Sequence, residues 1–205
     1  QGVVYRAWDP DLNRDVAIKT FERVSKGTDS HATLQGIYQD RVAGPLAHPN
    51  IIVIHDWAIE DVVPYMVMEY VPYNLGDVIT RGPVPPEHAV RIAAQVCQAL
   101  AYAHARKVIH RDIKPPNILL TSKELEKAEV KLTDFRIAII AGSDNPTFGG
   151  TLPYMAPEQF KGTKDIGPPT DVYAIAMMFW ELLAGQLPVE PDNLMMALEI
   201  YSGRT

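Results

Sequence analysis

Strand-like runs of mixed apolar and polar residues open the chain. The first two runs cover residues 2–8 and 15–21, and a cluster of turn-forming residues at 9–14 separates them. Asp, Pro and Asn favour turns through their backbone angles and local hydrogen bonds, so we expect a β-hairpin here. Two more β-rich runs follow at residues 51–57 and 65–70.

The pattern then becomes helical. Residues 71–74 interrupt the strand pattern, and between Pro86 and about Lys107 apolar residues recur at three- and four-residue spacings. This spacing predicts an amphipathic helix with one buried face. The residues expected on that face are Ala89, Ile92, Val96, Leu100 and Ala103.

A second strong helix is expected at residues 171–184, which are apolar nearly all round. Such a helix is typical of a protein core, so we expect it, with Trp180, to be buried in the middle of its lobe. Weaker helical patterns cover residues 25–47 and 193–201. Short strand-like pieces lie between the two strong helices, at residues 108–109, 118–120 and 130–132.

The order of the elements, with strands first and helices after them, predicts an α+β fold. We expect one domain made of two lobes. The β-rich N-lobe would cover residues 1–70, a hinge residues 71–74, and a larger helical C-lobe residues 75–205.

Composition excludes several classes of protein. The 205 residues are 47% hydrophobic and 21% charged, which is ordinary for a globular protein. A net charge of -6 argues against a general nucleic-acid-binding surface, which would be basic. The longest apolar run, residues 173–180, is too short to cross a bilayer. We expect a cytoplasmic location for this fragment, with any membrane tether outside it. The single cysteine, Cys97, rules out an internal disulfide and is expected to be buried.

The densest group of polar residues is the stretch HRDIKPPN at residues 110–117. Asp112, Lys114 and Asn117 stand there between two apolar pieces that would bury them near a core. Burying so many polar groups costs several kcal/mol, by order of magnitude, unless they are paired or bind something. The stretch is therefore either a salt-bridged loop or a site that gathers a base, a cation and a metal ligand.

Two more charged residues extend this group. Lys19 lies on the strand-like run VAIK among apolar neighbours, and Asp134 ends the run VKLTD. A lysine, an aspartate, an asparagine and a second aspartate in this order form the set that holds a polyphosphate and magnesium in phosphoryl transfer. Asn117 and Asp134 would supply the oxygen ligands that Mg²⁺ prefers.

These motifs resemble those of the eukaryotic-type Ser/Thr protein kinase family, in an order that spans nearly the whole chain. The resemblance adds three motifs to those above: residues 2–4 as the end of a Gly-rich loop, residues 150–158 (GTLPYMAPE) as the peptide-binding segment, and Asp171 as the residue that braces the catalytic loop. It implies a bilobal kinase fold and transfer of the γ-phosphoryl group of ATP, with Mg²⁺, to Ser or Thr hydroxyls of a protein substrate.

The resemblance also assigns roles to single residues. Asp112 would accept the proton of the substrate hydroxyl, Lys114 would steady the transferred group, and Lys19 would contact the phosphates of ATP. Asn117 and Asp134 would bind Mg²⁺. The remaining ATP contacts would come from Gly2, Val4, Ala17, the gatekeeper Met68, the backbone of Glu69 and Val71, and Leu119.

The chain departs from the family pattern at two positions that bear on activity. Gln39, with Asp40 beside it, stands where the family has the glutamate that pairs with the strand lysine. Arg136 replaces the glycine of the Asp-Phe-Gly motif, and would either point to solvent or contact Asp40, Asp112 or a phosphate. These departures leave open a second interpretation, a pseudokinase that binds nucleotide or acts as a scaffold. A small-molecule phosphotransferase is a third, although such enzymes usually lack an Ala-Pro-Glu segment.

Two further expectations follow from the same resemblance. Arg111 would bind a phosphate on Ser143 or Thr147, because its planar guanidinium matches phosphate oxygens. The chain begins at Gln1 inside a strand-like run and ends before the last helices of the family's fold, so we expect a fragment of a longer protein.

Overall fold

The structure is a computed structural model that describes six stretches of the chain: residues 2–21, 46–61, 63–135, 139–140, 151–160 and 165–188. The helix expected at residues 193–201 lies outside these stretches, as does all but the end of the one expected at 25–47.

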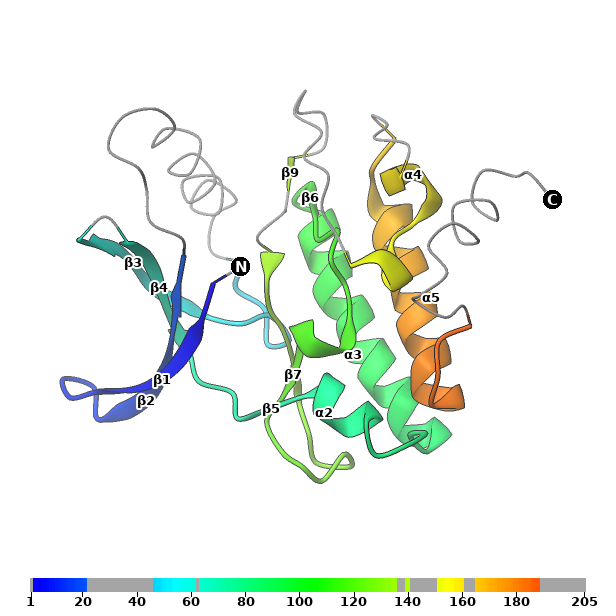
Figure 1. The fold of residues 1–205 in the computed structure, drawn as a ribbon, viewed down its shortest axis with the longest axis horizontal. Helices are drawn as coiled ribbons and strands as arrows, with labels where there is room; N and C mark the ends of the chain where they lie inside the picture. Colours follow the sequence, from blue (N-terminus) through cyan, green and yellow to red (C-terminus); the bar gives the residue numbers. More distant parts are fainter. Residues whose placement is uncertain are drawn as a thin grey trace.

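The N-terminal part is a four-stranded antiparallel sheet in the order β1-β2-β4-β3. Its strands are β1 (Val4–Asp9), β2 (Arg14–Thr20), β3 (Ile54–Glu60) and β4 (Val63–Glu69). The predicted hairpin is confirmed, with Val4 paired to Lys19 across β1 and β2. Figure 1 shows this sheet on one side of the molecule, apart from the helices.

Strand β3 begins three residues later than the expected start at residue 51. Asn50 and Ile52 are bonded instead to β8 (Val130–Leu132), a strand of the helical part. The backbone N–H of Ile52 donates to Leu132 O at 3.0 Å, and Leu132 N–H donates to Asn50 O at 2.8 Å. The first residues of this apolar run therefore bond to β8 and connect the N-terminal part to the helical part. The residues from Ile54 onward form β3 of the N-terminal sheet.

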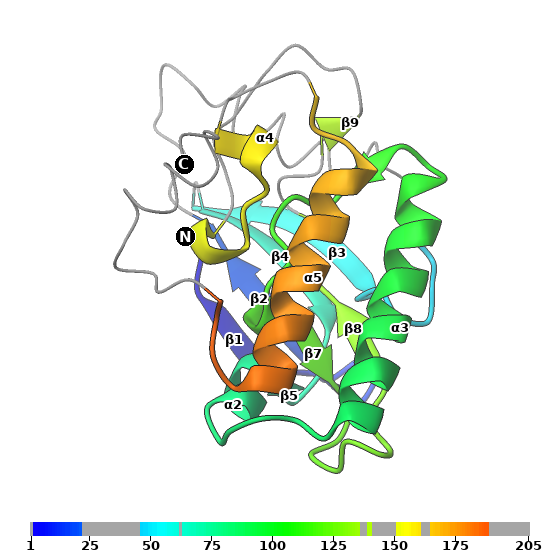
Figure 2. The ribbon, with the colours of Figure 1, turned by 90° about the vertical axis from the view of Figure 1, so that its right-hand side faces the viewer.

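The second part is built on two long helices, α3 (Pro86–His104) and α5 (Pro168–Ala184), which lie side by side and run in opposite directions (Figures 1 and 2). The short helices are α2 (Leu75–Ile79), α4 (Pro157–Phe160) and the 3-10 turns η1 (Pro115–Asn117) and η3 (Leu152–Tyr154). The short strands are β5 (Tyr73–Asn74), β6 (Val108–Ile109), β7 (Ile118–Leu120), β8 and β9 (Ile139–Ile140), which form the sheets β5-β7-β8 and β6-β9.

Helix α3 confirms the predicted amphipathic face. All five expected residues are buried, and four of them, Ala89, Ile92, Val96 and Leu100, pack in one core with β7, β8 and the inner face of α5. The helix ends at His104 rather than near Lys107, because the chain turns there and Lys107 adopts a left-handed backbone angle, φ 63°. The core therefore forms between the helix pair and the small sheet that carries the loop at residues 110–117.

Helix α5 begins earlier than predicted, with two prolines in its first turn, where a missing N–H leaves no hydrogen bond unmade. It is not buried all round. Ala174, Met178 and Leu182 face the core, while Val172 and Trp180 remain 60% and 55% exposed among the described residues. The expectation that Trp180 is a core residue was wrong.

Cys97 is exposed on α3, so its expected burial was wrong as well. It lies one residue after Val96, which is buried, and therefore falls on the outer side of the helix.

The two parts are joined by a short connection. Of the four residues expected as a hinge, Tyr73 and Asn74 belong to β5 and pair with Leu120 and Leu119.

In the part of the chain that the structure describes, no helix combines the length and the apolar character that a bilayer span needs.

Candidate active site

The loop at residues 110–117 leads from β6 to β7 and is held in place by helix α5. Asp171, in the first turn of α5, is fully buried. Its carboxylate accepts the backbone N–H groups of His110 at 2.9 Å and Arg111 at 2.8 Å, and it contacts His104 Nε2 at 2.7 Å. The bracing role expected for Asp171 is confirmed by these contacts.

Arg111 turns the loop through a left-handed backbone angle, φ 68°. Such an angle in a residue other than glycine costs about 1–3 kcal/mol and persists only where neighbours enforce it. Asp171 holds the N–H of Arg111, and Gln159 Nε2 donates to its carbonyl at 3.0 Å. The guanidinium is buried, which lowers the pKa of Arg111, while the negative charge of Asp171 acts in the opposite direction.

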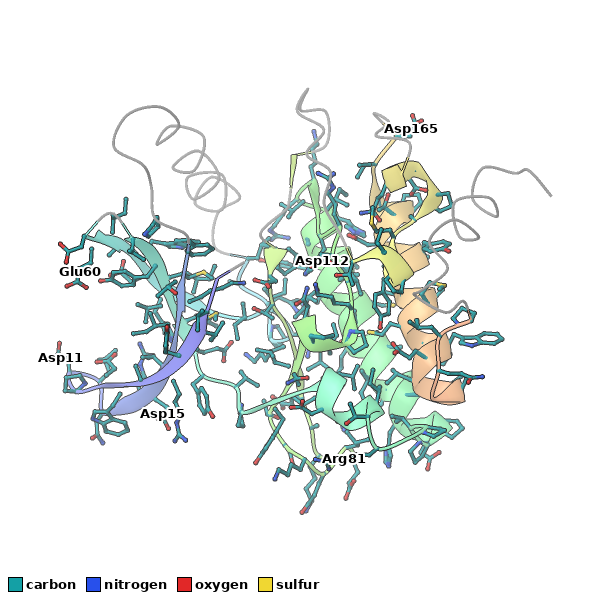
Figure 3. The ribbon with its side chains drawn as sticks, in the orientation of Figure 1. Asp11, Asp15, Glu60, Arg81, Asp112 and Asp165 are labelled. Atoms are coloured by element: carbon teal, nitrogen blue, oxygen red, sulfur yellow. The ribbon has the colours of Figure 1, made fainter. Side chains whose placement is uncertain are left out.

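The turn at Arg111 presents Asp112 to a group of polar partners near the centre of the molecule (Figure 3). Lys114 Nζ lies 2.9 Å from Asp112 Oδ2, and the hydroxyl of Thr151 donates to Asp112 Oδ1 at 2.9 Å. Lys114 also donates to that hydroxyl at 2.6 Å. Asn117 Nδ2 donates to the carbonyl of Asp112 at 2.7 Å and to Oδ2 at 3.2 Å. The loop is therefore salt-bridged, and it brings the carboxylate of Asp112 into contact with the cation of Lys114 and the amide of Asn117.

Asp134 reaches the same place from the end of β8. Thr133, just before it, donates its N–H to Asn117 O at 3.0 Å, and Thr133 O contacts His110 Nε2 at 2.8 Å. The backbone then turns at Asp134 itself, with φ 68°. Phe135 packs against the ring of His110, with centroids 4.6 Å apart. Strain at this site therefore lies at Asp134 and Arg111.

Lys19 comes to the site from the N-terminal sheet. Its side chain is buried, and its ammonium group forms an ion pair with the Asp134 carboxylate. A buried cation needs such a partner, because the cost of removing it from water is several kcal/mol, by order of magnitude. The contact joins strand β2 to the end of β8 and thus connects the two parts of the molecule.

Apolar residues of the expected ATP set lie beside this pair. Ala17 and Met68 are buried in one small cluster, and Val71 and Leu119 pack against it from the connection and from β7. Val4 does not belong to this cluster and is 54% exposed. Gly2 lies so close to Thr20 that a Cβ atom would collide with its carbonyl oxygen, so this position requires glycine.

The comparison with known proteins agrees with this geometry. The family model described as "Protein kinase domain" matches residues 1–202. The chain belongs to the protein kinase family. Its α+β, two-lobed arrangement is that of the family's fold, and the resemblance inferred from the motifs is confirmed.

Three bacterial kinases are among the curated proteins that this chain is similar to. Serine/threonine-protein kinase PrkC of Bacillus subtilis is 37% identical over 93% of this chain, and PknB of Mycobacterium leprae is 36% identical over the same share. Serine/threonine-protein kinase A of Synechocystis is 34% identical over 94%. The chain covers 29%, 31% and 40% of the lengths of these three relatives.

A member of this family uses ATP and typically a magnesium ion, and the donor set fits that ion. The amide nitrogen of Asn117 is bound to Asp112, which leaves its carbonyl oxygen to serve as a ligand. Asp134 contacts Lys19 through Oδ1, so Oδ2 is the second candidate oxygen. Both are hard oxygen donors of the kind that Mg²⁺ prefers.

Five residues to which the sequence assigns a role at the site lie outside the described residues: Gln39, Asp40, Arg136, Ser143 and Thr147. Thr151, Gln159 and the pair Tyr154–Glu181, by contrast, are in contact with the site or its supports but were not assigned such contacts from the sequence. Their partners lie far away in the chain, and no local pattern of residues indicates them.

Proposed function

We propose that this chain is the catalytic domain of a Ser/Thr protein kinase, which transfers the γ-phosphoryl group of ATP to Ser or Thr hydroxyls of protein substrates. The observation that carries the proposal is the hydrogen-bonded group around Asp112. It places a carboxylate, a lysine and an asparagine within direct contact of one another, beside the Lys19–Asp134 pair.

Asp112 is the residue that we propose as the general base. A base must lie within hydrogen-bond reach of the proton it accepts, and the carboxylate already accepts a threonine hydroxyl, that of Thr151. A substrate Ser or Thr hydroxyl presents the same donor. Lys114 lies against Asp112 and would hold the transferred group beside it, since a fixed cation stabilises the charge that spreads over the phosphoryl oxygens.

Lys19 and Asp134 would hold the phosphate end of ATP. In the proposed complex the ammonium group of Lys19 would contact phosphate oxygens, and Asp134 and Asn117 would hold the metal. The magnesium ion would neutralise the charge of the phosphates.

The base of ATP would lie against the apolar cluster. We propose that Ala17, Met68, Val71 and Leu119 enclose the adenine ring. Val4 of β1 and Gly2, which precedes β1, would cover the ring, and the backbone of Glu69 and Val71 would bond to its edge. In this arrangement residues 1–70 act as the N-lobe, 71–74 as the hinge and 75–205 as the C-lobe.

The test is phosphate transfer to protein. The full-length protein, incubated with Mg²⁺, ATP and a generic protein substrate, should place phosphate on Ser and Thr residues, as read by mass spectrometry. A protein that binds Mg²⁺–ATP in a thermal-shift assay, yet modifies no protein residue above an Asp112→Asn control, would instead be a pseudokinase. Turnover of a small alcohol in place of protein would equally contradict the proposal.

A further inference from the structure

A second ion pair joins the two lobes away from the reacting groups. Lys131, in the middle of β8, places its Nζ 3.0 Å from Glu69 Oε1 at the end of β4. The side chains are only 14% and 25% exposed. The surface pair Lys127–Glu124, by comparison, has side chains that are 71% and 57% exposed. Screening by water is therefore much weaker at the Lys131–Glu69 pair.

Besides its ion pair with Lys131, Glu69 makes two hydrogen bonds to Val53. Its Oε1 accepts the backbone N–H of Val53 at 2.7 Å, and its own backbone N–H donates to Val53 O at 2.9 Å. The position of the Glu69 backbone thus depends on a side chain that is shared between Val53 and Lys131. Glu69 is also the last residue of β4 before the connection to the C-lobe.

Lys131 is equally well placed on the other side. It pairs in register with Leu119 of β7, which packs against the cluster that contains Ala17 and Met68. From Lys131 the chain passes through Leu132, the last residue of β8, and Thr133 to Asp134. Lys131 therefore lies between Leu119 of β7, which packs against the apolar cluster, and Glu69, which precedes the connection to the C-lobe.

We propose that Lys131 is a positioning residue for the nucleotide base, acting through the Glu69 carboxylate. By holding that carboxylate, Lys131 sets the distance between the backbone of Glu69 above and Leu119 below. This inference rests on the proposed function only as far as it takes the apolar cluster to be the place where adenine binds. It assigns Lys131 no contact with the reacting atoms.

In the described part of the chain, loss of Lys131 would leave the backbone N–H of Val53 as the remaining hydrogen-bond partner of the partly buried Glu69 carboxylate. A carboxylate in that position gains by turning toward water. That movement would release Val53 and change the position of the Glu69 backbone. The predicted defect is thus in the affinity for the base, with little change in the chemical step.

The test compares Lys131→Met, Lys131→Arg and the surface control Lys127→Met in the full-length protein. Binding of adenosine and of Mg²⁺–ADP is measured by calorimetric titration, because adenosine reports on the base alone. For Lys131→Met we expect both dissociation constants to rise by about 3- to 10-fold, in keeping with a partly buried ion pair. Lys131→Arg should restore most of the affinity, and Lys127→Met should match the wild type.

The combination with Glu69→Gln tests the route. If Lys131 acts through Glu69, the double variant should bind adenosine no more weakly than the weaker single variant. Additive losses would overturn the inference, as would an adenosine affinity in Lys131→Met equal to that of the control. Weakening of Mg²⁺–ADP but not of adenosine would overturn it too, because that result places the effect at Asp134.

These binding measurements do not depend on turnover. A wild-type protein that binds adenosine but transfers no phosphate would contradict the proposed function, while the affinities of the variants would still decide the role of Lys131.

Discussion

At the scale of single residues, the arrangement of the proposed base, Asp112, depends on the hydroxyl group of Thr151. Its hydroxyl donates to Asp112 and accepts from Lys114, so one side chain fixes the spacing of two opposite charges. Thr151 is the N-cap of the 3-10 turn η3, which follows it directly in the chain. The orientation of Asp112 is thus set partly by the segment expected to receive the peptide.

Replacing Thr151 by valine should therefore lower kcat while nucleotide affinity is kept. The change preserves shape but removes the hydroxyl, and a lost hydrogen bond to a charged group corresponds to a decrease of about tenfold or more in rate. Thr151→Ser keeps the hydroxyl and should stay near wild-type activity. Steady-state kinetics that found the valine and serine variants equally active would contradict the role given to Thr151.

At the scale of elements, helix α5 supports the site at two points along its length. Its first turn holds the loop at residues 110–117 through Asp171, and near its other end Glu181 accepts the hydroxyl of Tyr154 at 2.6 Å. The segment at residues 151–160 and the loop at residues 110–117 are thus fixed to one helix. Their relative positions do not depend on flexible side chains at the surface.

Removing the charge of Asp171 should loosen the loop from that helix. In Asp171→Asn, two backbone N–H groups lose a buried carboxylate acceptor, so we expect the free energy of unfolding to fall by about 2–3 kcal/mol and kcat to fall with it. Urea denaturation gives the first quantity. The exposed Asp165, just before α5, offers a matched control, since Asp165→Asn should change neither. Wild-type stability in Asp171→Asn would contradict the bracing role.

The bond between Tyr154 and Glu181 should make stability depend on alkaline pH. Burial, and then the hydrogen bond to Glu181, raise the pKa of Tyr154 above its usual value of 10.0. Above pH 10 the unfolded tyrosine loses its proton while the folded one keeps it, so the folded state binds more protons and stability falls as pH rises. Below pH 10 this contribution is fully present.

Tyr154→Phe should therefore lower the free energy of unfolding by about 1 kcal/mol at pH 7. Between pH 9 and 11 the variant should lose less stability than the wild type, because the tyrosine that titrates is gone. Denaturation curves for the two proteins across that range measure the difference. Parallel decreases in both proteins would show that other groups cause the alkaline loss.

At the scale of the whole molecule, the sequence predicted what local patterns control. The hairpin and the buried face of α3 follow from periodicity, and the polar stretch at residues 110–117 from its motif. Strand β3 was placed too early because Ile51 and Ile52 pair with Leu132, far away in the chain. The partners of Thr151, Glu69 and Glu181 depend in the same way on how distant segments pack, which no local pattern encodes.

The exposure of Trp180 and Cys97 has a related cause. Hydrophobic character along a helix predicts that some face is covered, but the neighbouring elements decide which face it is. In the described part of the chain, α3 and the 3-10 turn η3 pack against α5, and Met178 and Leu182 are buried. The apolar composition of α5 alone did not distinguish the side with these two residues from the side with Trp180.

The central claim is that both lobes together form a site in which Asp112 accepts the substrate proton. The most direct measurement compares wild type and Asp112→Asn in the full-length protein, for Mg²⁺–ATP affinity and for phosphate transfer to Ser and Thr of a protein substrate. We predict equal affinities, because Asp112 does not hold the nucleotide, and a rate at least about 100-fold lower in the variant, as expected for loss of a general base. Equal transfer rates in the two proteins, with binding intact, would contradict the account.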